Sequence, residues 1–329
     1  MTRLLVILAA LAAPFAATTM AQAQNKFPTD AIRILVPYGP GGATDTSARV
    51  VAEHLKKHFN VSVVVENKVG ASGIIAIEEM MRAKPDGHTV MLGNVSTNGL
   101  TPILLKHKLK IDYPRDVVTL ARIVDAPVYM ITTAKDMPAK TFKDFIALMK
   151  ANPGKYRYSS AGHGSIQQID TAMLAAATGI DMIHVPTKAG APQIQRDIIN
   201  GDTQLSWSNP ASTLKFVKAG QVVPLAAVGN KRLSFMPELP TLAELGYPDV
   251  GSIQWQTIVA PSAVPADVQQ AWHMAIAETL KQPDIQQAIN RIGFMLPPVL
   301  SLGETKTWAK SEHDRYSKII TDLKIKIEE

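Results

Sequence analysis

The sequence predicts an α/β fold with mainly parallel sheets covered by helices, arranged either as one long sheet or as two smaller ones. Strand-length apolar runs alternate with segments of helical periodicity along most of the chain. No internal repeat or low-complexity linker interrupts them. Alternation on this scale is typical of parallel strands joined by helices that cover both faces of a sheet.

The first elements form a β-α-β unit. Residues 31–38 (AIRILVPY) read as a strand, and residues 61–65 (VSVVV) as a second, buried strand. Between them, Ala48, Val51 and Leu55 recur at helical spacing.

The same rhythm continues to the end of the chain. Further helices are predicted at 72–83, 141–151, 165–179 and 192–201, and further strands at 88–93, 156–160, 181–186, 203–207, 222–228 and 253–261. Three surface helices are expected last, at 271–282, 284–293 and 304–325.

Two irregular stretches suggest where the chain passes between two domains. Residues 122–133 form a long apolar extended segment with no helix immediately after it, and residues 231–248 are rich in proline. We therefore expect a discontinuous first domain, residues 24–125 and 230–329, and a second domain of residues 126–229.

The N-terminus, MTRLLVILAALAAPFAATTMAQAQ, has the features of a secretory signal. Arg3 precedes an apolar run, and Ala23 completes an A-x-A processing site. A membrane anchor is the alternative, but Pro14 interrupts a run that would need about 20 apolar residues. Cleavage near Ala23 leaves roughly 300 residues, enough for two ordinary domains. We expect an exported protein without its signal, residues 1–23.

Composition excludes several classes of function. The chain contains no cysteine, so disulfides, thiolate metal sites and a lipid-bearing cysteine are ruled out. Its 34 basic and 28 acidic residues give a formal charge of +6. That excess mildly favours anionic ligands, but the basic residues are scattered and lack the aromatic-studded patch typical of nucleic-acid binding.

The loop VPYGPGGATD, where the first strand runs into the first helix, is the first candidate site. Gly41 and Gly42 allow close approach of a ligand, and Thr44 or Asp45 is a candidate helix cap. Ligands of open α/β sheets bind beyond the carboxyl ends of strands, where helix N-termini favour anions. The glycine spacing matches neither a P-loop nor a dinucleotide-binding motif.

Three further loops place similar chemistry after a strand: LGNVSTNG (92–99), YSSAGHGSIQQ (158–168) and HVPTKAGAPQ (184–193). Hydroxyls and backbone amides can bind carboxylate oxygens without a charged partner. One such loop is easily a structural turn, whereas four of them point to a common binding site.

Catalysis and metal binding receive less support. Ser165 in GHGSI misses the G-x-S-x-G spacing of a hydrolase nucleophile. His54 and His58 are four residues apart on one helix, but HLKKH has no glutamate between them. We expect no enzyme activity, no metal and no cofactor.

Five motifs in order resemble the tripartite tricarboxylate transporter receptors, the TctC or Bug family. They are VPYGPGGATD, VVVENKVGASGIIAIEEMMRAKPDGHTVMLG, YSSAGHGS, HVPTKAGAP and MPELPTLAELGYP, and they span essentially the whole mature chain. The resemblance implies a two-domain periplasmic binding protein (type II-like) whose domains close over a small carboxylate. It also implies membrane transporter subunits as partners, and we expect a monomer.

The resemblance and the loop chemistry together define the expected ligand-binding residues. They are Tyr38, Gly41, Gly42, Thr44, Asp45, Asn94, Ser96, Thr97, Ser160, Ala161, Gly162, His163, Gly164, Ser165, Thr187, Lys188, Ala189, Gly190, Trp207 and Ser208.

Two departures from the family pattern bear on the ligand. Trp207-Ser208-Asn209 stands where many relatives have an aromatic-Asp-Asn run, and Thr187-Lys188-Ala189 where they often have Tyr-Lys-Gly. A serine at 208 removes a partner for a ligand ammonium group, which weakens the case for an amino acid. If His163 and Trp207 both face the cleft, they offer a hydrogen-bonding edge and a flat apolar wall.

The sequence thus predicts a periplasmic receptor that captures a di- or tricarboxylate or an aromatic carboxylate for a tripartite transporter. A ligand-sensing input protein of a two-component system is the main alternative, and a secreted hydrolase is a distant one.

Overall fold

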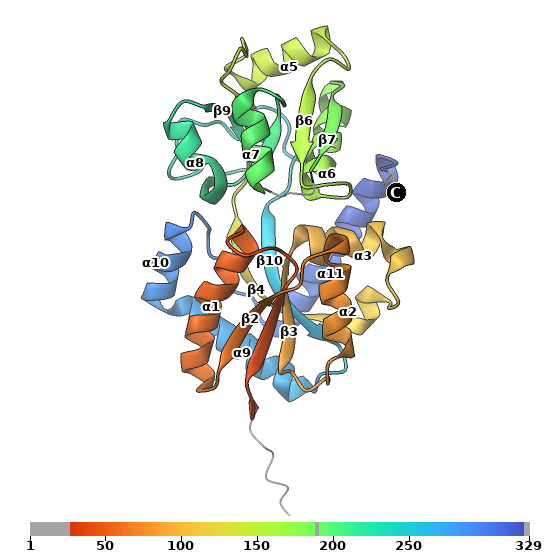
Figure 1. Cartoon of the computed structure of the whole chain (residues 1–329), viewed down its shortest axis with the longest axis vertical. Coiled ribbons are helices and arrows are strands. Elements are labelled where there is room, and N and C mark those ends of the chain that lie inside the picture. The colour runs from red at the N-terminus through yellow and green to blue at the C-terminus, as the bar shows by residue number, and fades with distance from the viewer. Residues whose placement is uncertain (1–26, 188–190, 326–329) are drawn as a thin grey trace, which may run out of the picture.

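The computed structural model describes residues 27–187 and 191–325 and confirms the α/β fold, with two groups of strands flanked by helices (Figure 1). The predicted signal peptide and the expected site residues Lys188, Ala189 and Gly190 lie outside the described residues. Within them, no helix is long and apolar enough to cross a membrane.

The first sheet contains five strands in the order β2-β1-β3-β10-β4. β1 (Ile32–Val36) pairs in parallel with β2 (Val63–Asn67) and β3 (Thr89–Asn94). β10 (Gln254–Pro261) lies between β3 and β4 (Val117–Ala126) and runs antiparallel to both.

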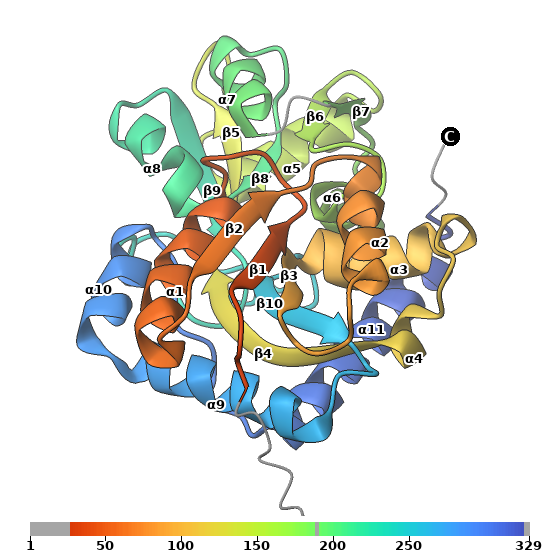
Figure 2. The same ribbon diagram turned by 60° about the horizontal axis from the view of Figure 1, so that its bottom comes forward.

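Side-chain alternation along β1 places helices on both faces of this sheet. Ile34 and Val36 pack with α1 (Ala43–Phe59), α9 (Ala266–Lys281) and α10 (Pro283–Arg291). Leu35 packs on the other face with α2 (Ile74–Arg82). Successive side chains of a strand point to opposite faces, so a strand covered on both sides needs apolar residues at consecutive positions, as at Ile34, Leu35 and Val36. Figure 2 shows α1 and α2 on opposite sides of β1.

The second sheet consists of two parts joined by one bridge. β5 (Tyr129–Thr133) pairs antiparallel with β8 (Ser206–Ser208) and β9 (Val222–Ala227). β6 (Arg157–Ser160) pairs in parallel with β7 (Ile183–Pro186), and a parallel bridge links Tyr158 to Leu205 beside β8. The order is therefore β7-β6-β8-β5-β9, with β5 running against its neighbours.

Helices α5 (Phe142–Ala151), α6 (Ile166–Thr178), α7 (Ala191–Asn200) and α8 (Pro210–Lys218) accompany this second sheet. We call the first sheet with its helices the first lobe, and the second sheet with these four helices the second lobe.

The short elements that follow β2 and β3 belong to the first lobe. They are η1 (Ala71–Gly73), η2 (Val95–Leu100), α3 (Thr101–Leu104), η3 (Lys106–Lys108) and α4 (Tyr113–Asp116). The hydrophobic pattern does not reveal them, because each is too short to show a helical period.

The chain passes from one lobe to the other directly between β4 and β5, and it returns between β9 and β10. Within the returning segment, Leu233 and Met236 pack with Tyr129 and Ile131 of β5. The expected domain boundary at 229/230 stays a prediction, and these contacts favour a crossing nearer to β10.

The C-terminal helix α11 (Leu302–Asp322) fastens the two lobes together. It packs against β4 and η2 of the first lobe, where the Arg122 guanidinium lies 4.5 Å from the ring centroid of Trp308. Its Tyr316 is buried in a core that also contains Ile169 and Met173 of α6. The core that encloses Tyr316 of α11 therefore includes residues of both lobes.

Candidate functional site

The loop between β1 and α1 is held in shape by a buried carboxylate. The Gly41 N–H donates to Asp45 Oδ2 over 2.9 Å, and Asp45 also accepts hydrogen bonds from Arg49 and Asn67. Burial alone would raise the pKa of Asp45, but these donors hold it below its ordinary value. The negative charge of Asp45 is thus stabilised by donors from the loop, α1 and β2.

Gly41 and Gly42 have different backbone conformations. Gly41 has φ +78°, in the left-handed region that favours glycine. Gly42 has φ −72° and is the N-cap of α1, and no side chain caps this helix. The expectation that Thr44 or Asp45 caps α1 is therefore wrong: both lie inside the helix and are buried.

Asn94 joins this loop to the loop after β3. Its Oδ1 accepts hydrogen bonds from the Tyr38 hydroxyl over 2.7 Å and from the Ser96 N–H over 2.9 Å, while its Nδ2 donates to Thr44 Oγ1. Burial of the Tyr38 hydroxyl raises its pKa to about 12, so Tyr38 acts as a donor at neutral pH.

The start of η2 leaves no room for a side chain at Gly93. A Cβ there would lie 2.2 Å from Oδ1 of Asn98. Asn98 in turn donates to Thr257 Oγ1 on β10, and the Thr97 hydroxyl accepts from the Asn94 N–H. The structure therefore gathers Tyr38, Thr44, Asn94, Ser96 and Thr97 into one hydrogen-bonded cluster.

In the second lobe, the loop between β6 and α6 folds around two serines. Ser160 Oγ accepts a hydrogen bond from the Gly162 N–H, and Ser165 Oγ donates to the Gly162 carbonyl over 2.7 Å. Gly162 and Gly164 have φ +118° and +74°, which explains a glycine at each position. Ser165 is the N-cap of α6, but its side chain does not cap the helix.

His184 of β7 contacts this loop through Ser160 and His163. Its Nε2 lies 2.6 Å from Ser160 Oγ, its ring stacks on Tyr158 at a centroid distance of 4.8 Å, and the His163 ring meets it edge-on. Burial, together with a smaller effect of nearby His163, lowers the pKa of His184 to about 4. The imidazole is therefore neutral at neutral pH.

The Ser160–His184 pair has the spacing of a nucleophile and its base, but not the accessibility. Ser160 is 0% exposed. A nucleophile must reach the substrate, and its base must take up the proton that it releases. The contact therefore shapes the loop, and the two hydroxyls of residues 160 and 165 face their own backbone.

One hydrogen bond joins the loops of the two lobes directly. The N–H of Ile166, the first residue of α6, donates to Ser96 Oγ over 3.4 Å. Residues 160–165 and 94–97 are consequently neighbours, as the sequence predicted for loops at the carboxyl ends of strands. Ala161 and His163 are exposed in the same loop.

The remaining expected residues differ in their surroundings. Thr187 follows β7, and its N–H donates to the Ser160 carbonyl. Ser208 ends β8 and is half-buried. Trp207 is only 1% exposed, and its indole N–H donates to Thr171 of α6. Trp207 therefore faces the core, and the flat apolar wall expected from it is absent from the described structure.

Sequence reasoning missed Asn67 and Gln168. Asn67 Nδ2 donates to the Tyr38 carbonyl as well as to Asp45, and Gln168 Oε1 accepts from the Gly164 N–H. Asn67 ends β2, the parallel neighbour of β1, so its position at a strand end was an available signal.

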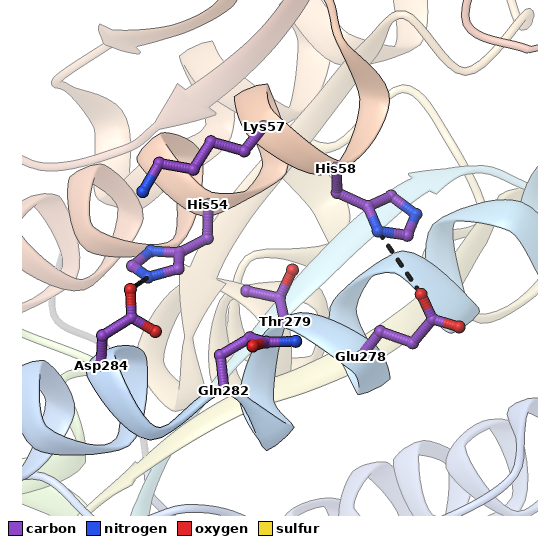
Figure 3. A pocket seen from close by; sticks show the side chains of 7 residues that line it. All are labelled: His54, Lys57, His58, Glu278, Thr279, Gln282 and Asp284. Carbon is purple, nitrogen blue, oxygen red and sulfur yellow. Dashed lines mark hydrogen bonds and ion pairs between the residues drawn. The ribbon is translucent and has the colours of Figure 1, made fainter.

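A separate hollow of about 310 Å³ lies at the far end of α1 (Figure 3). Its two histidines turn to different acids: His54 Nε2 lies 2.9 Å from Asp284, and His58 Nδ1 lies 3.5 Å from Glu278. No group of three or more His, Asp or Glu side chains able to hold a metal occurs in the described residues. The shared metal considered for His54 and His58 thus lacks a third ligand there.

The arrangement of two α/β lobes with loops meeting between them is that of a periplasmic binding protein. A solved periplasmic transporter protein is 31% identical, with a TM-score of 0.83, over 92% of this chain and 100% of that one. The periplasmic binding protein BugD superposes with a TM-score of 0.79 at 25% identity, over 91% and 99%.

The chain belongs to the tripartite tricarboxylate transporter family of receptors, whose sequence pattern matches residues 47–325. Protein BugT of Bordetella pertussis is 27% identical over 99% of both chains. An R. palustris protein solved with adipate is 26% identical, with a TM-score of 0.82, over 91% of this chain and 99% of that chain. The protein is thus a periplasmic solute receptor, and the hydrolase alternative is wrong.

Proposed function

We propose that this receptor captures a small di- or tricarboxylate between its lobes and delivers it to the membrane subunits of a tripartite tricarboxylate transporter. The observation that carries the proposal is a hydrogen-bonded contact between the site loops of the two lobes, beside two helices that begin without capping side chains. α1 and α6 begin at Gly42 and Ser165 with no side-chain cap, as do α2, α9 and α10 away from the contact between the loops, whereas Thr141, Asn209 and Ser301 cap α5, α8 and α11.

Uncapped N–H groups at a helix start favour an anion. α1 and α6 come from different lobes. The Ser96–Ile166 hydrogen bond joins the start of α6 to the loop after β3, and Asn94 of that loop donates to Thr44 of α1. An anion with two carboxylates can therefore engage both lobes at once. The Tyr38 hydroxyl and the amide of Asn94 supply uncharged polar groups beside α1.

Burial of Trp207 favours an aliphatic ligand over an aromatic one. No indole face is available to stack on a ring, because Trp207 is enclosed beside Thr171. The similar R. palustris protein solved with adipate supports a flexible dicarboxylate. His163, exposed on the second-lobe loop, is our candidate partner for a distal carboxylate.

We further propose that ligand draws the lobes together about the two crossings near residues 127–128 and 251–253. The first crossing is short, which suits a hinge. The export signal, with cleavage near Ala23, and the monomeric state belong to the same proposal.

Calorimetric titration with adipate, and with adipamide as its neutral analogue, tests the ligand class. We expect adipate to bind and adipamide to bind much more weakly, because the helix N-termini favour negative charge. Equal affinity for both compounds would contradict the anion site. Delivery is tested by transport into proteoliposomes that contain the membrane subunits, which should require the liganded receptor.

A further inference from the structure

A buried polar cluster joins α6 to α11 behind the site. Asp170 of α6 is 0% exposed, Ser252 lies in the segment that leads back to β10, and Tyr316 belongs to α11. The Ser252 hydroxyl and N–H are close enough to Asp170 to oppose the rise in its pKa. The Ser252 hydroxyl has the same effect on the pKa of Tyr316. Three separate chain segments therefore meet at one point.

These side chains lack hydrogen-bond partners of good geometry. Among the described residues, none contacts either carboxylate oxygen of Asp170, the Ser252 hydroxyl or the Tyr316 hydroxyl in hydrogen-bonding geometry. An ionised carboxylate enclosed without donors is costly, and proteins avoid that cost by pairing the charge or by neutralising it.

Pairing is not available in this arrangement. Arg315 is close enough to oppose the rise in the pKa of Asp170, but it forms no ion pair with that carboxylate in the described structure. Its guanidinium lies 3.7 Å from Glu312 and 5.0 Å from the ring centroid of Tyr316. Burial raises the pKa of Asp170 to about 8, and the opposing effects of Ser252 and Arg315 do not offset it.

We propose that Asp170 is a proton-binding site, in which the neutral acid is enclosed where α6 meets the returning segment and α11. This inference concerns the joint between the lobes and does not depend on the proposed ligand. α6 begins at the second-lobe site loop, and α11 packs on the first lobe, so the proton is bound where the two lobes are fastened together.

The sign of the expected pH dependence follows from the raised pKa. The unfolded chain loses this proton near the ordinary value of 3.8, whereas the folded protein keeps it to about pH 8. The stability that this proton supplies is full below pH 3.8 and declines as the pH rises, until it is lost above about pH 8.

Asp170→Asn retains the shape of the neutral acid and cannot ionise. We expect its Tm to rise relative to the wild type as the pH increases from about 4 to about 8, by several degrees in total, and the difference to level off above that. Asp181→Asn, at an exposed aspartate of the same lobe, is the matched control and should show no such trend.

Infrared spectroscopy provides a readout that does not require the variant to be stable. The wild type at neutral pH should show the carbonyl band of a neutral carboxylic acid, and this band should disappear as the pH rises past 8. A wild-type spectrum without that band, or a Tm difference between Asp170→Asn and wild type that is constant with pH, would overturn the proposal.

Discussion

The Tyr38 hydroxyl donates a 2.7 Å hydrogen bond to Oδ1 of Asn94, and this bond ties the loop after β1 to the loop after β3. Because Asn94 also contacts Ser96 and Thr44, loss of the bond should loosen both loops. The two strands end side by side, so a single phenol can organise two separate segments of the chain.

Tyr38→Phe should therefore weaken binding of adipate and lower the free energy of unfolding by about 1 kcal/mol, the usual contribution of one hydrogen bond. Tyr113→Phe is the matched control, since that buried hydroxyl has no partner among the described residues. Calorimetry and chemical denaturation measure the two quantities. Equal losses in both variants would show that the Tyr38–Asn94 bond has no particular role.

Most of the fold could be predicted from the sequence because strands such as β1 and β3 are buried on both faces. β1 must be apolar at Ile34 and at Leu35, since one side chain meets α1 and the other meets α2. Such runs, alternating with helical periods, identify an α/β fold without tertiary information. The antiparallel direction of β10 could not be read this way, because hydrophobicity does not encode strand direction.

The sequence predicts which loops form the candidate site, but it does not predict which way each side chain in them points. Ser96 and Ser165 follow strands, as expected of ligand loops, and the structure places their loops in contact. Trp207 was a poor candidate because an aromatic residue at a strand end looks the same whether it faces a ligand or the core. Only the indole contact with Thr171 separates these cases.

Ser96→Ala should favour an open arrangement of the lobes. The change removes the acceptor for the Ile166 N–H, which is the hydrogen bond between the two site loops. We expect a larger radius of gyration without ligand by solution scattering. Ser165→Ala removes a bond within the second lobe and should lower stability without opening. An unchanged Ser96→Ala profile would argue against a role for this contact in closure.

Protonation of His184 should destabilise the protein in mild acid. Its pKa is lowered to about 4, chiefly by burial, so the unfolded chain binds this proton at a higher pH than the folded protein does. The contribution of His184 to stability should fall as the pH decreases from about 6.5 to about 4, opposite in sign to that of Asp170. The Tm of His184→Gln should therefore rise relative to that of the wild type as the pH decreases over this range. Parallel curves for the wild type and His184→Gln would disprove the assignment.

Substitutions at the adjacent residues Gly41 and Gly42 distinguish an effect of backbone strain on stability from an effect on ligand binding. Gly41→Ala places a side chain at φ +78° and should lower the free energy of unfolding by roughly 1–2 kcal/mol, although its Cβ meets no atom within 4 Å. Gly42 has φ −72°, and a Cβ there makes only an ordinary 3.5 Å contact with the Gly39 carbonyl. Gly42→Val should therefore keep its melting temperature and lose affinity for adipate, because the side chain obstructs the uncapped N-terminus of α1. A Gly42→Val protein that melts early but binds adipate normally would show that this glycine serves the turn alone.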